Sequence, residues 1–270
     1  MMAENEIKIV VAGPRGRMGS ETIRMIQKNP RFSLVAAVDV HHDRDKVSDW
    51  VQGAQDTDAL IYTDIEQCFS VTAPDVFIDF TKPDSGKKNL QQAINFAVRP
   101  VIGTSGFSNE EVSDFKRQMD EKKLGGIIAP NFAIGAVLVM KFSQMAAKYF
   151  PDVEIIELHH DKKKDAPSGT AVKTAELIAK NRTPKKQGAA DETETLAGAR
   201  GADFDGMRIH SVRLPGLVAH QEVLFGGKGE LLTLRHDSMD RASFMTGVAY
   251  AVTTSLSLDT LVYGLENILD

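Results

Sequence analysis

IKIVVAGPRGRMG, residues 7–19, decides the fold of the N-terminal half of the chain. A short apolar run, 7–12, leads directly into a loop with glycine at every third position, and a helical segment follows at 20–28. Strand, glycine loop and helix in this order are typical of a dinucleotide-binding unit, because glycine lets the backbone approach a pyrophosphate and a helix start attracts negative charge. The loop Gly13-x-x-Gly16-x-x-Gly19 is one residue longer than the usual Gly-x-Gly-x-x-Gly, so its context has to support the interpretation.

A second apolar strand, 33–38, ends in Asp39, twenty residues after Gly19. An acidic side chain at this place accepts hydrogen bonds from the adenine ribose of a dinucleotide. Asp39 is therefore the predicted ribose ligand, and the alternative is a turn residue at the end of a strand.

Strands and helices continue to alternate along the chain. We expect strands at 59–62, 75–81, 100–102 and 126–129, and helices at 64–69, 83–97 and 108–123, the last with a capping box from Ser108 and Glu111. Apolar strands separated by helices predict a parallel sheet that is covered on both faces, with 126–129 as its last strand. The N-terminal half is thus an α/β domain with a Rossmann-type doubly wound sheet.

Ligands of such sheets bind beyond the carboxyl ends of the strands. Several segments with small or polar residues fall there: Gly13 to Gly19, Asp39, Thr81, Gly103-Thr104-Ser105 and Ala129-Pro130-Asn131-Phe132. The small residues at 103–105 would let a flat nicotinamide approach the backbone, and a simple tight turn is the alternative.

A second stretch, 154–180, carries the chemistry. It runs from a strand at 154–158 through His159-His160-Asp161-Lys162-Lys163-Lys164-Asp165 to Ala166-Pro167-Ser168-Gly169-Thr170, which opens a helix that continues to Lys180. The unpaired N–H groups of a helix start at Ser168, Gly169 and Thr170 form an anion site, and the histidines and lysines supply protons and positive charge beside it. This pattern indicates acid catalysis on a small anion.

Other interpretations of this stretch stay open. A lysine triplet is usually a solvated surface feature, and a helix start with proline and serine is usually only a cap. His-His-Asp could bind a transition metal, but adjacent side chains of a strand point to opposite faces and no further ligand stands nearby, so no metal is expected.

The second half predicts an α+β domain. A long apolar helix at 131–149 precedes the central strand. We expect three antiparallel strands at 207–214, 218–225 and 230–235, joined by glycine-rich turns, in an open mixed or antiparallel sheet. Helices on one face would leave the other face to be buried by self-association. The residues at 181–205 predict a long mobile loop that partly covers the cleft, or else a plain solvated loop.

The end of the chain is expected to return to the first domain. Segments 242–258 and 261–268 predict helices that pack on the N-terminal half. This division gives a dinucleotide-binding domain at 1–130 together with 240–270, and a substrate-binding and oligomerisation domain at 131–239.

Composition excludes several classes of protein. The 270 residues are 42% hydrophobic and 26% charged, with a net charge of −5, which argues against a nucleic-acid surface. The longest apolar run, 132–140, is far shorter than the ~20 residues of a membrane span. The single Cys68 cannot form an internal bridge, and the acidic start at 1–6 has no export sequence behind it, so we expect a cytoplasmic enzyme.

Two runs resemble a known family. They are Val-Ala-Gly13-x-x-Gly16-Arg17-Met18-Gly19 and His159-His160-x-x-Lys163-x-Asp165-Ala166-Pro167-Ser168-Gly169-Thr170-Ala171, and the likeness extends over nearly the whole chain. The protein resembles the 4-hydroxy-tetrahydrodipicolinate reductase (dihydrodipicolinate reductase) family of bacterial lysine and diaminopimelate synthesis. The resemblance implies reduction of a cyclic dicarboxylic imine by NADH or NADPH with loss of water, and a homotetramer assembled through the second domain's sheet.

The resemblance also implies roles for individual residues. His159 would be the general acid and base, Lys163 a proton donor, and His160, Gly169 and Thr170, next to Ser168, substrate ligands. The dinucleotide would be held by Gly13, Pro14, Arg15, Gly16, Arg17, Met18, Asp39, Gly103, Thr104, Ser105, Ala129, Pro130, Asn131 and Phe132.

One position departs from the family pattern. Several members have an arginine directly after the acidic ribose ligand, where it holds the extra phosphate of NADPH, and this chain has Val40 there. We therefore predict a preference for NADH, although Arg17, His41, His42 or Lys46 could receive that phosphate.

Two further functions stay open on the sequence. The chain could be another two-domain dehydrogenase of a small carboxylate, although many of these use a cysteine nucleophile and Cys68 has no glycine-rich context. It could also be a dinucleotide-sensing protein without turnover, which the intact set of His159, Lys163 and Ser168-Gly169-Thr170 disfavours.

Overall fold

The computed structural model describes residues 6–54 and 57–269. Most of the acidic start, on which the expected location partly rests, lies outside these residues. The chain forms two compact units, one of Met1–Phe132 with Phe244–Asp270 and one of Ala133–Ser243. No helix in the described part of the chain combines the length and the hydrophobicity that crossing a bilayer requires.

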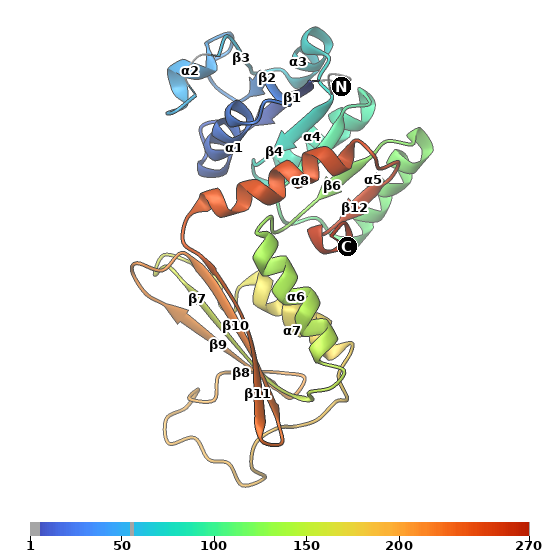
Figure 1. Ribbon diagram of the computed structural model, residues 1–270. Coiled ribbons are helices and arrows are strands. Elements are labelled where there is room, and N and C mark those ends of the chain that lie inside the picture. The colour runs from blue at the N-terminus through green and yellow to red at the C-terminus, as the bar shows by residue number, and fades with distance from the viewer. Residues whose placement is uncertain (1–5, 55–56, 270) are drawn as a thin grey trace. The chain divides into compact units, whose positions relative to one another are not determined.

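Unit 1 is built on a seven-stranded sheet in which every pairing is parallel (Figure 1). Its order is β3 (Leu60–Tyr62), β2 (Phe32–Val38), β1 (Ile7–Ala12), β4 (Val76–Asp79), β5 (Arg99–Ile102), β6 (Gly126–Ile128) and β12 (Leu261–Tyr263). The order 3-2-1-4-5-6 is that of a dinucleotide-binding fold, with its ligand crevice where the order reverses at β1. The predicted doubly wound parallel sheet is confirmed.

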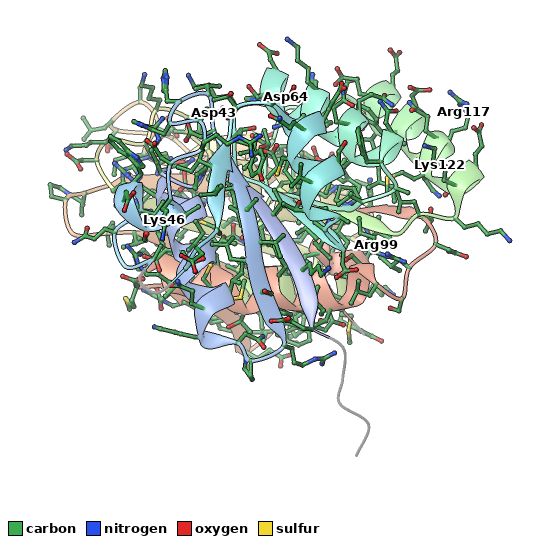
Figure 2. The ribbon with its side chains drawn as sticks, turned by 90° about the horizontal axis from the view of Figure 1, so that it is seen from above. Asp43, Lys46, Asp64, Arg99, Arg117 and Lys122 are labelled. Carbon is green, nitrogen blue, oxygen red and sulfur yellow. The ribbon has the colours of Figure 1, made fainter. Side chains whose placement is uncertain are left out.

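Helices cover both faces of this sheet (Figure 1). On one face lie α1 (Arg17–Lys28) and α8 (Met245–Ser255), and on the other lie α3 (Ile65–Thr72), α4 (Pro83–Asn95) and α5 (Asn109–Lys122), with the short α2 (Val47–Trp50) after β2. The predicted capping box at Ser108 and Glu111 is present at the start of α5. Charged side chains of α5, among them Arg117, point outward from the layer (Figure 2).

The end of the chain corrects two expectations. The segment 261–268 was expected to be helical, but it contains β12, which pairs in parallel with β6, and the 3₁₀ turn η2 (Leu265–Asn267). The strand at 126–129 is therefore not the last of the sheet. Leu261 is 3% exposed because it fills the core at the sheet edge, a long-range contact that local periodicity does not report.

Unit 2 is a five-stranded sheet with helices α6 (Ile134–Ala146) and α7 (Gly169–Ala179) packed on one face (Figure 1). The strand order is β11 (Glu230–Ser238), β10 (Ala219–Gly227), β7 (Asp152–His159), β9 (Met207–Arg213) and β8 (Ala202–Phe204). Val153, Ile155, Val223 and Phe225 face the helices and are buried. The predicted α+β domain with a mixed sheet is confirmed.

Two local expectations for unit 2 were wrong. The three strands after 206 do not form one antiparallel meander, because β9 pairs in parallel with β7 and only β10 and β11 form a hairpin. The expected helix from 131 begins at Ile134, so 131–132 precede the helix.

The segment 181–205, expected to be a loop, ends in the strand β8 and is anchored rather than free. The Gln187 side chain pairs with both backbone groups of Val153 at 2.9 Å, and the buried Arg182 donates to the carbonyls of Pro151 and Lys185. These anchors lie at the beginning of β7, whereas His159 is at its other end, six residues and about 20 Å along the strand. These contacts therefore hold the segment at the beginning of β7, far from His159.

Candidate functional site

The glycine loop after β1 depends on close backbone packing. Gly13 has a φ of 73°, and a Cβ at Gly19 would lie 2.1 Å from the Gly13 carbonyl oxygen. Only glycine fits at position 19, because that oxygen belongs to the backbone and cannot move independently. No side chain caps the first turn of α1, whose N-cap is Gly16. The loop therefore presents a helix start to an anion, as the pyrophosphate of a dinucleotide requires.

Register brings the other candidate segments to the same edge of the sheet. Ala12 pairs with Val38 on one side and with Asp79 on the other. Gly13, Asp39 and Phe80 consequently leave the sheet next to one another. A Cβ added at Gly13 would lie 3.4 Å from the Phe80 carbonyl oxygen and 3.4 Å from the Thr81 side chain, so the loops after β1 and β4 meet.

Asp39 does not stand alone at the end of β2. Its carboxylate forms a bidentate pair with Arg15, with nitrogen–oxygen distances of 2.7 and 2.9 Å, and it accepts from the His41 N–H at 3.2 Å. Burial raises the pKa of the Asp39 carboxyl, but the hydrogen bonds from Arg15 and His41 outweigh it and lower the pKa. The predicted ribose ligand is thus ionised and already neutralised by the predicted loop residue Arg15.

Asp79, at the end of β4, organises two of the loops. It is fully buried and accepts hydrogen bonds from Thr81, from Asn89 at 2.7 Å and from the Thr104 hydroxyl at 3.1 Å. The Thr104 side chain is therefore held inside the protein, and only its backbone could serve a ligand. Sequence reasoning assigned no role to Asp79, although a carboxylate at the end of a buried strand needs hydrogen-bond partners.

Gly103 is closely packed against two aromatic side chains. A Cβ there would lie 2.2 Å from the Phe80 ring and 3.1 Å from the Phe132 ring, and these rings meet edge to face with centroids 5.7 Å apart. The two aromatic rings therefore require glycine here, and the approach of a nicotinamide to 103–105 stays a prediction.

The remaining candidate residues of unit 1 differ in their exposure. Ser105 and Pro130 are exposed, Ala129 is buried and donates its N–H to Ile102, and Asn131 is half-buried. Pro14 is buried in the glycine loop, and Arg17 and Met18 begin α1. The segments after β1, β2, β4, β5 and β6 thus gather at one edge of unit 1.

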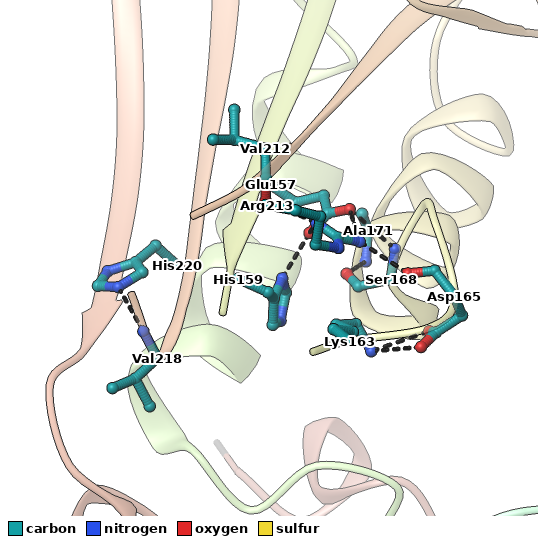
Figure 3. A network of polar contacts seen from close by, with 10 residues as sticks. All are labelled: Glu157, His159, Lys163, Asp165, Ser168, Ala171, Val212, Arg213, Val218 and His220. Atoms are coloured by element: carbon teal, nitrogen blue, oxygen red, sulfur yellow. Dashed lines mark hydrogen bonds and ion pairs between the residues drawn. The ribbon is translucent and has the colours of Figure 1, made fainter. Parts of the chain in front are cut away.

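In unit 2, the end of β7 places His159 beside a buried carboxylate (Figure 3). Glu157 and His159 are two residues apart in the strand, so both side chains lie on the helix-covered face. The His159 Nδ1 is 2.5 Å from Oε2 of Glu157, whose side chain is 0% exposed. The histidine itself is 15% exposed, which leaves its ring accessible to a ligand.

Arg213 holds the same carboxylate from the neighbouring strand. It is the cross-strand partner of His159, and its two terminal nitrogens lie 2.7 and 3.0 Å from the Glu157 oxygens. Burial raises the pKa of Glu157, but hydrogen bonds from His159, Arg213 and Ser211 outweigh it and lower the pKa to about 2. Glu157 is therefore ionised at neutral pH and can only accept hydrogen bonds.

Of the lysine triplet, the structure singles out the middle member. Lys162 and Lys164 are exposed, whereas the Lys163 side chain is 21% exposed and its ammonium group is 2.8 Å from Asp165. The Lys163 hydrogen bond lowers the pKa of Asp165. Since Arg213 also donates to the Asp165 carbonyl, the loop that carries Lys163 is tied to the His159 network.

The start of α7 is the predicted anion site. Ser168 is the N-cap and accepts from the Ala171 N–H, while its own N–H donates to Glu157 at 3.2 Å. Gly169 is exposed, and a Cβ added there would meet nothing within 4 Å. An incoming carboxylate can therefore reach the first turn, which continues with Thr170. His160 follows the strand, and its carbonyl accepts from the Lys163 N–H.

Sequence reasoning missed Glu157 and Arg213. Glu157 could have been found, because it falls on the same strand face as Val153 and Ile155, where an acid needs partners. Arg213 has no comparable pattern, since the pairing of β9 with β7 is not visible in the sequence. Among residues 6–54 and 57–269, no group of three His, Cys, Asp or Glu side chains is arranged to hold a metal.

Cys68 is unsuited to nucleophilic catalysis. It is buried on α3, and burial raises the pKa of its thiol to about 12. The thiolate, which is the reactive form, is therefore negligible at neutral pH.

Comparisons with known proteins agree over the full length. Two family models match, "Dihydrodipicolinate reductase, N-terminus" at residues 7–132 and "Dihydrodipicolinate reductase, C-terminus" at 135–269. The 4-hydroxy-tetrahydrodipicolinate reductase of Bacillus mycoides is 59% identical over 98% of this chain and 99% of its own length, and that of Bacillus licheniformis is 58% identical over 100% of both.

A solved structure is similarly close. Dipicolinate-bound dihydrodipicolinate reductase from Paenisporosarcina sp. TG-14 has a TM-score of 0.90 and 50% identity, and the match covers 98% of this chain and 100% of that one. An amine dehydrogenase from Mycobacterium smegmatis, at 11% identity and a TM-score of 0.68, shares the fold.

Proposed function

Because the chain belongs to the dihydrodipicolinate reductase family, we propose that it reduces 4-hydroxy-tetrahydrodipicolinate to tetrahydrodipicolinate in the synthesis of lysine and diaminopimelate. It is an NAD(P)H-dependent oxidoreductase. One observation carries the assignment to this chain's own residues: His159, Lys163 and the open start of α7 are joined into one network at one end of the five-stranded sheet.

The chemistry divides between the two units. The start of α7 at Ser168, Gly169 and Thr170, together with His160 and Lys163, holds the carboxylates of the substrate. His159 donates a proton to the ring nitrogen as electrons move onto it. The substrate gains one hydride and one proton and loses one water.

The residues of unit 1 fit a dinucleotide. The glycine at position 19 lets the loop pack closely, and the uncapped first turn of α1 offers its N–H groups to a pyrophosphate. Asp39, at the end of the neighbouring strand, would bind the ribose. The segments at 103–105 and 129–132 would lie against the other half of the cofactor. When bound, the dinucleotide supplies the hydride.

A coupled assay tests this function. The intact protein is incubated with the condensation product of pyruvate and aspartate semialdehyde, and oxidation of NADH or NADPH is followed by absorbance. Turnover with this substrate supports the proposal. Binding of dinucleotide without oxidation would favour the sensing alternative, and oxidation only with other carboxylates would favour a different dehydrogenase.

Cofactor preference is the finer part of the proposal. Val40, 79% exposed, offers no cation to a 2′-phosphate, which supports a preference for NADH. The Arg15–Asp39 pair acts in the opposite direction, because the guanidinium offsets the carboxylate charge that would repel this phosphate.

Removing that guanidinium should sharpen the preference. In Arg15→Ala we expect the ratio of kcat/KM for NADH to kcat/KM for NADPH to rise about tenfold, since Asp39 is then free to repel the phosphate. Arg117→Ala, which breaks an arginine–carboxylate pair on α5, is the control and should leave the ratio unchanged. An unaltered ratio in Arg15→Ala would show that the pair has no part in specificity.

Assembly and location stay predictions. The face of the five-stranded sheet opposite α6 and α7 carries half-buried apolar side chains such as Ile156 and Leu224, which supports a homotetramer formed through this face. Sedimentation of the intact chain is the measurement that checks it. A cytoplasmic location agrees with a biosynthetic role.

A further inference from the structure

One buried carboxylate contacts three different elements at the catalytic end of unit 2. Glu157 accepts from His159 Nδ1, from both terminal nitrogens of Arg213 and from the N–H of Ser168, the residue that caps α7 (Figure 3). All of these contacts are made by a side chain that is 0% exposed. A buried carboxylate with this many donors is held in a single position.

The contact with His159 decides which ring nitrogen carries a proton. An ionised carboxylate has no hydrogen to give, so Nδ1 of His159 must be the donor in this hydrogen bond. In the neutral ring Nε2 is then without a proton. Within the described part of the chain nothing hydrogen-bonds to Nε2, which lies on the ring edge opposite Glu157 (Figure 3).

Arg213 keeps this arrangement in place. Its bidentate pair with Glu157 stabilises the charged form of the carboxylate, and its hydrogen bond to the Asp165 carbonyl fixes the loop that carries Lys163. His159 and the start of α7 are thus both held in place by contacts with the Glu157 carboxylate.

We propose that Glu157 is the positioning residue of the reaction, which holds the proton of His159 on Nδ1 so that Nε2 exchanges the catalytic proton, and which aligns His159 with the start of α7. The proposal rests on the proposed function for its catalytic part. Its structural part, the identity of the protonated nitrogen, is independent of turnover.

The matched control lies on the same strand. Glu154 also accepts from an arginine and a histidine, Arg200 and His210, with the histidine Nε2 at 2.8 Å. It faces the opposite side of the strand from Glu157. Glu154→Gln therefore removes a similar carboxylate without touching His159.

Nitrogen NMR of the histidine rings tests the structural part directly. At about pH 8, where an ordinary imidazole is neutral, the wild-type His159 ring should carry its proton on Nδ1, with the resonance assigned from its loss in His159→Gln. In Glu157→Gln we expect a shift toward the form protonated on Nε2, and no shift in Glu154→Gln. A wild-type ring protonated on Nε2 overturns the proposal without any substitution.

Kinetics test the catalytic part. Glu157→Gln should lower kcat about 10- to 100-fold with the KM for the dinucleotide unchanged, and Glu157→Asp should recover part of this loss. The double variant Glu157→Gln, His159→Gln should be no slower than His159→Gln alone, because Glu157 acts through His159. If the losses of kcat in the two single variants multiply in the double variant, Glu157 acts independently of His159 and its role is merely structural. A wild-type protein without turnover would refute the function and leave the ring assignment standing.

Discussion

In His159→Gln we expect kcat to fall by about 10²- to 10⁴-fold, the usual contribution of a positioned general acid. Glutamine keeps a polar side chain of similar size beside Glu157 but cannot deliver a proton from a titrating ring. Dinucleotide affinity should be unchanged, because the predicted cofactor residues belong to unit 1. Stopped-flow or steady-state oxidation of NADH, with calorimetric titration of the dinucleotide, measures both quantities.

Lys163→Ala extends this test to the second catalytic candidate. We expect kcat/KM for the imine to fall about 100-fold, since an ammonium group that offsets a carboxylate and supplies a proton is lost. Lys164→Ala is the neighbouring control, because Lys164 is exposed. His210→Gln, on β9, is the control for His159. Wild-type rates in His159→Gln and Lys163→Ala would remove both residues from the mechanism.

Gly19→Ala should strongly weaken dinucleotide binding. The added Cβ would meet the Gly13 carbonyl oxygen at 2.1 Å and the Pro14 Cα at 3.0 Å, so the backbone of the loop has to move. A displaced loop no longer places its N–H groups for a pyrophosphate. We expect the Kd for NADH to rise at least about 30-fold, which corresponds to roughly 2 kcal/mol.

The control for this substitution is another glycine. Gly226, on β10, has only ordinary contacts with Asp152 at 3.8 Å and beyond, and its φ is not positive, so Gly226→Ala should leave the Kd unchanged. Circular dichroism and thermal unfolding separate a local change in the loop from loss of the fold. A folded Gly19→Ala protein that binds NADH as tightly as the wild type would contradict this account of the loop.

Much of the fold follows from local patterns. The apolar runs predict the strands of unit 1, Ser108 and Glu111 predict the start of α5, and Ser168 is the N-cap of α7 as expected. These features depend on residues within one turn or one strand of each other, so they can be recognised in the sequence. The family motifs add the roles of His159 and Lys163, which stay predictions.

The features that sequence reasoning missed depend on residues far apart in the chain. Leu261 becomes part of a strand because β6 offers it a partner, and Gly103 lacks a side chain because Phe80 and Phe132 fill the space. The Glu157–Arg213 pair joins residues 56 positions apart across β7 and β9. Their parallel pairing decides which arginine reaches the buried acid.

The sequence by itself thus determined the order of most elements, the glycine loop, the capped helix start and the two candidate proton donors. The tertiary structure alone decided how the second sheet pairs, which lysine of the triplet is half-buried and which carboxylate holds His159. The reason is physical: helix caps and tight loops are stabilised by near neighbours, whereas a buried charge is stabilised by whichever donors the packed strands bring to it.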